Sequence, residues 1–239
     1  MTTSKYRPTP EELDFLGFRL SAKPEEPKGS DDAPLDLERT LFKVCLHLQE
    51  DRFDGRLASV MMSWMKVHGD RVHVDRLRTM RLDFCERHRR DVLWLRYFAY
   101  YNVSLKRHRW QKLTEVVAGA NAEELRIGDT TMAQAQVERW GLEPFLPTHS
   151  KLKVHKGALR VRENDVLDEQ ALMRRNTQYR NRFRFGANAR CDVVTHMESN
   201  RFQSVKELSR FLGLSRETVR CHWEDNKRFL EVIGGVSPH

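Results

Sequence analysis

The length, composition and charge of the chain limit the classes of protein to which it can belong. With 239 residues, 39% of them hydrophobic, the chain can bury one large core or two smaller ones, and its formal charge of +8 favours a polyanionic partner. The four cysteines never form a C-x-x-C pair, which excludes the usual zinc-finger spacing, and no apolar run reaches the length of a membrane span. We therefore expect a globular cytoplasmic protein with reduced thiols and without a membrane segment, a metal or a cofactor.

Residues 1–35 are expected to form a flexible tail or a docking segment. They hold five prolines, and apolar residues recur between Glu11 and Leu20. This short apolar stretch can pack on a partner subunit or lie as a strap over its own domain. The sequence leaves both alternatives open.

Apolar residues at helical spacing predict a helical domain over residues 36–142. The stripes lie at residues 37–48, 57–65, 74–84 and 92–98, and further helices are expected at 111–118 and 132–140. We interpret the Met and Trp residues of these stripes as core, because methionine fills irregular gaps between helices. Aromatic residues also lie between the basic segments 87–90 and 106–110, a pattern that can stack bases of single-stranded nucleic acid. An interior helix with charged ends explains the same pattern more simply.

A linker with two basic segments is expected at residues 143–185. Strict alternation on both sides of Lys156-Gly157 predicts a short β-hairpin with one apolar face and one basic face. The cations of the basic face that we assign to DNA are Lys151, Lys153, Arg160 and Arg162. The hairpin is interpreted as a ribbon that faces phosphates, with an ordinary solvated edge hairpin as the alternative.

The second basic segment, residues 173–186, contains no acidic residue and leads directly into the last part of the chain. Arginine stays charged and can bridge phosphate oxygens. We therefore predict that Arg180, Arg182 and Arg184 contact the DNA backbone. Pairing with acidic residues of the same protein is the alternative.

Residues 204–220 predict two short helices joined by a tight turn. Ser204 can cap the first helix, with Glu207 closing a capping box. Gly213 accepts the left-handed backbone conformation that ends this helix, and Ser215 can cap the second. Val219 continues the buried stripe of the second helix. The residues on its opposite side, predicted to face DNA, are Ser215, Arg216, Glu217, Arg220 and Glu224.

The run ELSRFLGLSRETVR resembles the recognition segment of bacterial helix-turn-helix regulators. Residues 185–197 are similar to the first helix of a winged-helix domain in ArsR- and MarR-like regulators. This resemblance covers roughly the last fifty residues, about one DNA-binding module, and implies a winged-helix-like domain over residues 186–239. We expect the recognition helix to end near Asp225 and residues 228–233 to form a wing strand, unless these residues prolong the helix.

The sequence thus predicts a mainly α-helical protein with an N-terminal helical domain, a short basic β-hairpin and a C-terminal winged-helix-like domain. The leading hypothesis is sequence-specific binding to double-stranded DNA by a homodimer, with transcriptional regulation as its role. The helical domain would then serve assembly or signal sensing. An antitoxin-like or adaptor protein, whose helical domain binds a protein partner, is the first alternative.

A metal-dependent nuclease is the second alternative. It would use the acidic cluster Glu163, Asp165, Asp168 and Glu169, just past the basic hairpin. These carboxylates can equally open a helix, where negative charge offsets the N-terminal dipole. The sequence shows no phosphate loop or catalytic motif, so we assign no catalytic residue and expect no enzyme.

Overall fold

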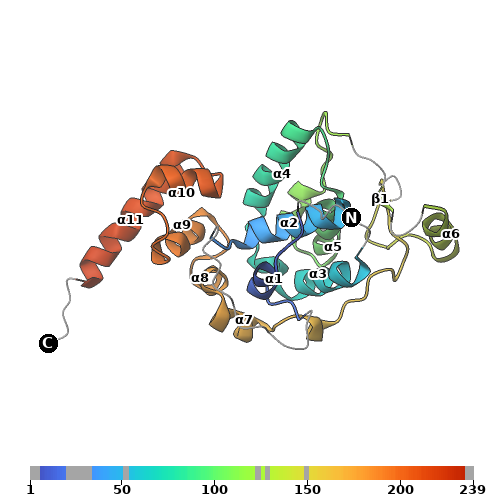
Figure 1. Ribbon diagram of the computed structural model, residues 1–239, viewed down its shortest axis with the longest axis horizontal. Helices are drawn as coiled ribbons and strands as arrows, with labels where there is room; N and C mark the ends of the chain where they lie inside the picture. The colour runs from blue at the N-terminus through green and yellow to red at the C-terminus, as the bar shows by residue number, and fades with distance from the viewer. Residues whose placement is uncertain are drawn as a thin grey trace.

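The computed structural model describes residues 6–19, 34–50, 54–121, 125–126, 130–147 and 151–234. The protein is mainly helical, as the sequence predicts. Figure 1 shows a larger helical body and a smaller group of helices that ends in a long helix at the C-terminal side. None of the helices in the described ranges combines the length and the apolar character needed to cross a membrane.

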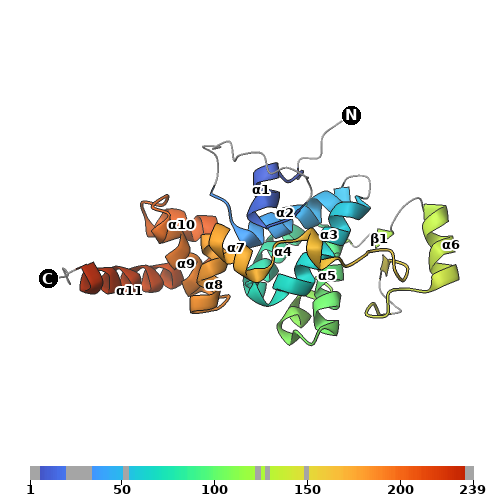
Figure 2. The ribbon, with the colours of Figure 1, turned by 90° about the horizontal axis from the view of Figure 1, so that it is seen from below.

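Four helices form the centre of the helical body and pack side by side (Figures 1 and 2). They are α2 (Leu37–Glu50), α3 (Gly55–His68), α4 (Val74–His88) and α5 (Leu93–Ser104), with the short 3-10 turn η1 (Gly69–Arg71) between α3 and α4. Their core buries Trp64, Trp94, Tyr97 and Phe98 completely. These aromatic rings are therefore core residues, and they are not available to stack bases.

The N-terminal segment packs on this body as a strap. Helix α1 (Pro10–Phe15) is capped by Thr9, and the following Leu16 and Phe18 are buried in the main core. The indole nitrogen of Trp64 donates to the carbonyl of Leu16 at 2.8 Å. Of the two alternatives for this segment, the structure thus favours the strap for residues 6–19. The remainder of the expected tail lies mostly outside the described residues.

The helix expected at residues 111–118 is replaced by a 3-10 helix, η2 (His108–Leu113). The buried guanidinium of Arg81 donates to the carbonyls of Leu113 at 3.0 Å and Glu115 at 2.8 Å. An α-helix would commit these carbonyls to its own backbone, so the tertiary contact with Arg81 explains why the segment leaves the helical path. The other expected helix is present as α6 (Thr130–Trp140).

The predicted β-hairpin over residues 151–162 is not formed. Strand β2 (Leu152–Lys153) pairs in parallel with β1 (Leu125–Arg126), and Gly157 has the positive φ expected of a turn. After this turn the chain follows α3, where the amide of Arg162 donates to Ser63 Oγ at 2.9 Å. Leu152, Val154 and Leu159 still reach the main core. The alternation therefore predicted the burial of these three side chains, but it was wrong for Val161, the fourth residue of the expected apolar face, which is exposed, and for the pairing of the backbone.

The C-terminal helices have a small core of their own. They are α7 (Glu169–Arg175), preceded by the turn η3 (Glu163–Asp165), then α8 (Thr177–Phe185), α9 (Ala189–Glu198), α10 (Val205–Leu212) and α11 (Arg216–Gly234). Val193 of α9, Leu208 and Leu212 of α10 and Val219 of α11 form a buried cluster that is separate from the main core. The two apolar clusters are bridged by α8, whose Tyr179 belongs to the main core.

The expected wing strand is replaced by helix. The recognition helix does not end near Asp225, because α11 continues to Gly234 through residues 228–233. A lone strand here would leave its backbone groups unpaired, whereas a helix satisfies them internally. The second alternative, a prolonged helix, is therefore the one found.

His68 joins α3 to α8 inside the main body. Its Nδ1 lies 2.6 Å from the hydroxyl of Tyr179 and its Nε2 lies 2.9 Å from the carbonyl of Leu167. Burial lowers the pKa of His68 to about 4, because a charged imidazolium would lose its hydration there. The neutral form is thus the one that the folded protein accommodates.

We expect the folded protein to lose stability as the pH falls from about 6.5 to about 4. In this window His68 is protonated in the unfolded chain and neutral in the folded one, so protons favour unfolding. The full difference corresponds to roughly 3 kcal/mol. Urea unfolding of the wild type and of His68→Gln at about pH 7 and about pH 4.5 measures it. If both proteins lose stability equally, His68 is not the source of the effect.

Candidate nucleic-acid interface

The helix-turn-helix predicted from the sequence has the expected local geometry. Ser204 Oγ accepts the amide of Glu207 at 3.3 Å, and Gly213 has a φ of 67° and a ψ of 27°, in the left-handed region. Ser215 Oγ accepts the amide of Thr218 at 3.1 Å and so caps α11. One detail differs, because the Glu207 carboxylate accepts the amide of Gln203 and does not close the capping box on Ser204.

Helix α11 separates a buried side from an exposed side in its first turns. Val219 is fully buried, and Trp223 packs partly buried against the same cluster. The five residues predicted to face DNA are all exposed: Ser215, Arg216, Glu217, Arg220 and Glu224. Arg220 and Glu217 form an ion pair at 2.8 Å, which holds the guanidinium along the helix surface. The first turns of α11 therefore present both donors and acceptors to the outside.

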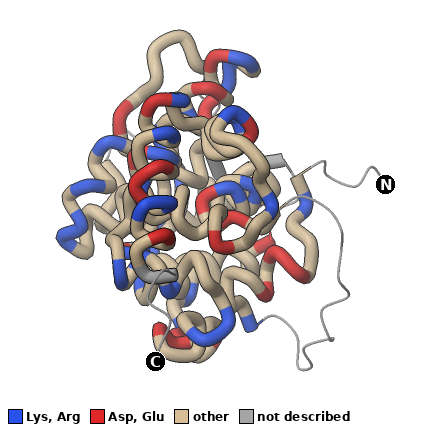
Figure 3. Tube along the Cα trace, turned by 90° about the vertical axis from the view of Figure 1, so that its left-hand side faces the viewer, with Lys and Arg blue, Asp and Glu red and all other residues tan. Residues whose placement is uncertain are grey.

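Other exposed cations lie on the remaining C-terminal helices and in the loop before α10. They are Arg180 and Arg184 on α8, Arg190 on α9, Arg201 in the loop that follows, and Lys206 and Arg210 on α10. Figure 3 views this end of the molecule and shows Lys and Arg interspersed with Asp and Glu along the chain. Exposed residues of both signs therefore lie along these helices, for example Arg220 beside Glu217 and Lys206 beside Glu207.

Arg182 is not part of this surface. Its side chain is buried, and its Nη2 lies 2.9 Å from Glu38 Oε2 and in contact with Asp192 Oδ1. On α8, Arg180 and Arg184 are exposed, whereas Arg182 between them is buried. The prediction that Arg182 contacts DNA is therefore wrong, and the alternative of intramolecular pairing holds for this residue.

Arg182 belongs to a group of buried polar side chains at the junction between the helical body and the C-terminal helices. This buried ion cluster consists of Asp36, Glu38, His73, Arg76, Gln178, Arg182, Asp192 and His196. Arg76 Nη1 lies 2.6 Å from Asp36 Oδ2, and His73 Nδ1 lies 2.8 Å from Asp192 Oδ2. The cluster joins the beginnings of α2 and α4 to α8 and α9.

The three carboxyls of the buried ion cluster differ in their pKa. Burial by itself would raise the pKa of each. For Asp36 the nearby Arg76 and His196 outweigh burial and hold the pKa well below its usual range, and for Asp192 the pKa is lowered mainly by Arg182 and His73. Burial raises the pKa of Glu38, which has Arg182 beside it but also two other carboxylates. The charged form is thus favoured most at Asp36 and Asp192, beside the arginines.

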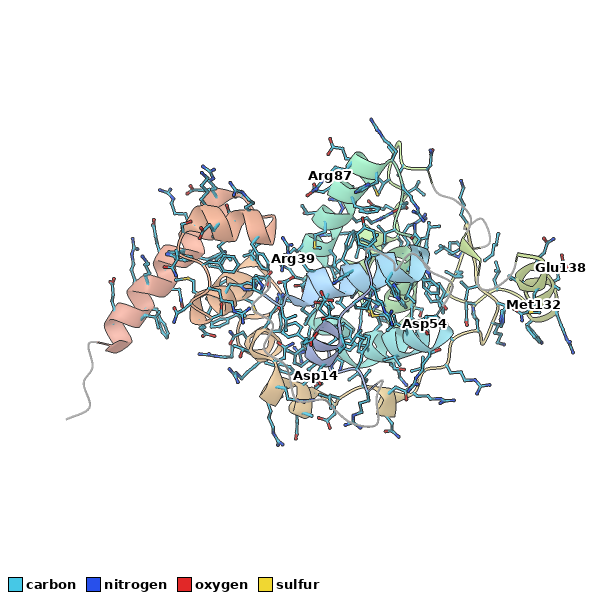
Figure 4. All side chains as sticks on the ribbon, viewed as in Figure 1. Asp14, Arg39, Asp54, Arg87, Met132 and Glu138 are labelled. Carbon is cyan, nitrogen blue, oxygen red and sulfur yellow. The ribbon has the colours of Figure 1, made fainter. Side chains whose placement is uncertain are left out.

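Two arginines of the helical body hold the C-terminal end of α10. Arg76 Nε donates to the carbonyl of Leu212 at 3.0 Å. Arg39 donates to the carbonyl of Phe211 and places its guanidinium 4.3 Å from the centre of that ring. Cations at a helix C-terminus satisfy free carbonyls and interact favourably with the helix dipole. Figure 4 shows Arg39 where the helical body faces the C-terminal helices, so α10 is fixed in its orientation.

The other basic residues predicted to hold phosphates lie elsewhere. Strand β2, which contains Lys153, lies with β1 and α6 at the end of the molecule opposite α11 in both views (Figures 1 and 2). Arg160 and Arg162 are exposed, and their amides bond to serines of α3 in the helical body. A single copy of the protein therefore does not place the basic segment 151–162 beside the helix-turn-helix.

The acidic residues proposed for a nuclease serve separate structural roles. Glu163 pairs with Lys66 at 2.8 Å, Glu169 pairs with Arg71 at 3.7 Å, and Asp168 caps α7. No three ligand-type side chains of this segment converge within the described residues. The carboxylates named for the nuclease alternative are thus not gathered into one site.

Comparison of the chain with protein-family models, with curated proteins and with solved structures found no match. What the protein does must therefore be inferred from its own residues. Sequence reasoning missed Arg39 and Arg76 as residues that position the helix-turn-helix. No local signal could have revealed them, because their partners on α10 are 172 and 136 residues away.

We expect Arg182→Met to destabilise the protein by about 3–5 kcal/mol, because it leaves buried carboxylates without their cation. Arg180→Met is the matched control, since Arg180 lies two residues earlier on the same helix and is exposed. That control should change the free energy of unfolding by roughly 0.5 kcal/mol or less. Urea unfolding followed by circular dichroism measures both. Similar losses in the two variants would contradict the role assigned to the buried ion cluster.

Proposed function

We propose that the protein binds double-stranded DNA through α10, the turn at Gly213 and α11, with the first turns of α11 in the major groove. The observation that carries this proposal is the division of α11 after a left-handed glycine turn. Val219 is buried, while Arg216 and Arg220 are exposed on the surface that adjoins it, about 60° and 100° around the helix. A helix with its side chains is about 10–12 Å wide, which matches the major groove of about 12 Å.

The side chains on this face suit the reading of base edges. Arginine can donate two hydrogen bonds to guanine, and glutamate can accept from the amino group of cytosine. Arg220 is already oriented by Glu217, so less side-chain freedom is lost when it makes a directional contact. Mixed charge on the reading helix thus supports recognition of a particular sequence, and transcriptional regulation is the role we assign to it.

Exposed cations next to α11 would hold the phosphates. Arg201, Lys206 and Arg210 lie on α10 and just before it, close along the chain to the turn. Phosphate contacts position a protein on the duplex without reading its sequence. A homodimer would place two such readers on two half-sites and so double the contact area. The helical body is then free for assembly or for a protein partner.

An adaptor or antitoxin-like protein remains the second candidate because of the far end of α11. There Phe229, Leu230 and Val232 are 54%, 54% and 70% exposed. Exposed apolar side chains on one helix end are the kind of surface that binds another protein. Selection of bound duplexes from a random pool separates the candidates, since an adaptor of this kind would enrich no sequence.

We expect Arg220→Ala to weaken binding to the selected duplex by roughly 1–3 kcal/mol and to relax the preference at one base pair. Arg228→Ala is the control, because Arg228 is also exposed on α11 but lies two turns beyond Arg220. Gel shifts with the selected duplex and with single-base variants measure both effects. Unchanged affinity and unchanged preference in Arg220→Ala would refute the placement of this helix in the groove.

We expect the combined variant Arg201→Ala, Lys206→Ala, Arg210→Ala to bind all duplexes more weakly and with a smaller salt dependence. Each lost phosphate contact removes about 0.9 from the slope of log affinity against log salt, so a change of about two is expected if most of the three engage. The control neutralises Lys151, Lys153, Arg160 and Arg162, which lie away from α11, and should keep the wild-type slope. A flatter slope in this control alone would place the phosphates on the other end of the molecule.

A further inference from the structure

We propose that α11 carries a binding site for a zinc-class metal ion, formed by Cys221, His222 and Asp225. One ligand atom from each residue, the thiol sulfur, an imidazole nitrogen and a carboxylate oxygen, lies within 4.8 Å of the other two. Ligands of tetrahedral zinc, with bonds of about 2.0–2.3 Å, lie about 3.3–3.8 Å apart. None of the three side chains is buried, so small changes of their rotamers can close this difference.

The spacing of the three residues on one helix produces this convergence. Asp225 follows Cys221 by four residues and His222 by three, and side chains at these spacings are neighbours on a helix surface. The site therefore needs no loop and no rearrangement of the backbone. It is the one group of three or more such ligands in the parts of the chain that the structure describes.

The chemistry of the donors selects the class of metal. A thiolate and an imidazole favour Zn²⁺ and similar transition ions, whereas Ca²⁺ and Mg²⁺ prefer oxygen ligands throughout. Cys221 would release its thiol proton to solvent on binding, because the thiolate is the ligand form. Three protein ligands leave a fourth position for water or for another ligand.

Cys221 is also the cysteine best placed to bind an ion. Cys45, Cys85 and Cys191 are all buried, and burial raises the pKa of each, to about 11 for Cys85 and about 12 for Cys191. Cys221 alone among the four is exposed. Any sulfur signal from a bound metal can therefore be assigned to α11.

The site lies beside the face that we assign to DNA, and its existence does not depend on that assignment. Cys221 and Asp225 each follow directly a residue of that face, Arg220 and Glu224, and are turned from it by about 100° along the helix. A bound ion would join two successive turns of α11. Metal binding can be measured without DNA, so failure of one proposal leaves the other standing.

The test is a titration of the full-length protein with Co²⁺ under reducing conditions and without an affinity tag. Co²⁺ replaces Zn²⁺ with the same ligands and absorbs light. We expect one Co²⁺ per chain, with a sulfur-to-cobalt charge-transfer band in the near ultraviolet and visible bands of a four-coordinate ion. Zn²⁺ should abolish these bands by displacing Co²⁺.

Three variants and one control assign the ligands. Cys221→Ser should abolish the charge-transfer band, and His222→Ala and Asp225→Asn should each weaken binding by about tenfold or more. Glu231→Gln is the control, since Glu231 is also exposed on α11 but lies six residues beyond Asp225, and this variant should bind Co²⁺ like the wild type. The proposal is overturned if the wild type gives no charge-transfer band, if Cys221→Ser keeps the band, or if one ion binds per two chains.

Discussion

The arrangement of this protein depends on burying charges of both signs at one junction. Asp36 and Glu38 enter from the start of α2, Arg76 from α4, Arg182 from α8 and Asp192 from α9, and all of them are withdrawn from water. Each charge would be strongly unfavourable alone, because burial removes its hydration. The four helices therefore have to assemble together, since any helix that is missing leaves a buried charge without its partner.

The buried ion cluster fixes the C-terminal helices to the helical body. An apolar interface tolerates sliding and rotation, but hydrogen-bonded ion pairs at 2.6 Å and 2.9 Å allow one orientation. Arg76 serves both systems, because its Nη1 pairs with Asp36 while its Nε holds the end of α10 at Leu212. The position of the helix-turn-helix is thus coupled directly to the buried ion cluster. A change at the junction would be transmitted to α10 through Arg76.

The same arrangement decides which arginines remain free for a partner. Residues 173–186 read as one uniformly basic segment, yet α8 directs Arg182 to the inside and leaves Arg180 and Arg184 on the surface. The buried Arg182 pairs with Glu38 and Asp192, whereas the exposed Arg180 and Arg184 add positive charge to the surface. A basic segment can therefore contain two kinds of arginine. One kind pairs with carboxylates inside the protein, and the other stays on the surface, where a partner can bind it.

The C-terminal part of α11 extends beyond the small apolar core on which the first part of the helix packs. Val219 and Trp223 pack against the small cluster, and Asn226 still contacts Met197 at the end of α9. Beyond that point the described side chains of α11 are exposed. The packing of the protein uses neither this projecting end nor the side chains of Cys221 and Asp225 just before it, which are exposed.

The sequence by itself determined the features that rest on neighbours within a few residues. The caps at Ser204 and Ser215, the left-handed Gly213 and the burial of Val219 follow from local hydrogen bonds, backbone freedom and helical periodicity, and the structure has all of them. Only the tertiary structure decided that Arg182 is buried, because its partner Glu38 is 144 residues away. The tertiary structure likewise decided that β2 pairs with β1 and forms no hairpin. A charged residue or a strand has many possible partners along a chain. The packing of whole helices selects one of them, and a local sequence pattern does not contain that information because the partners are far apart in the sequence.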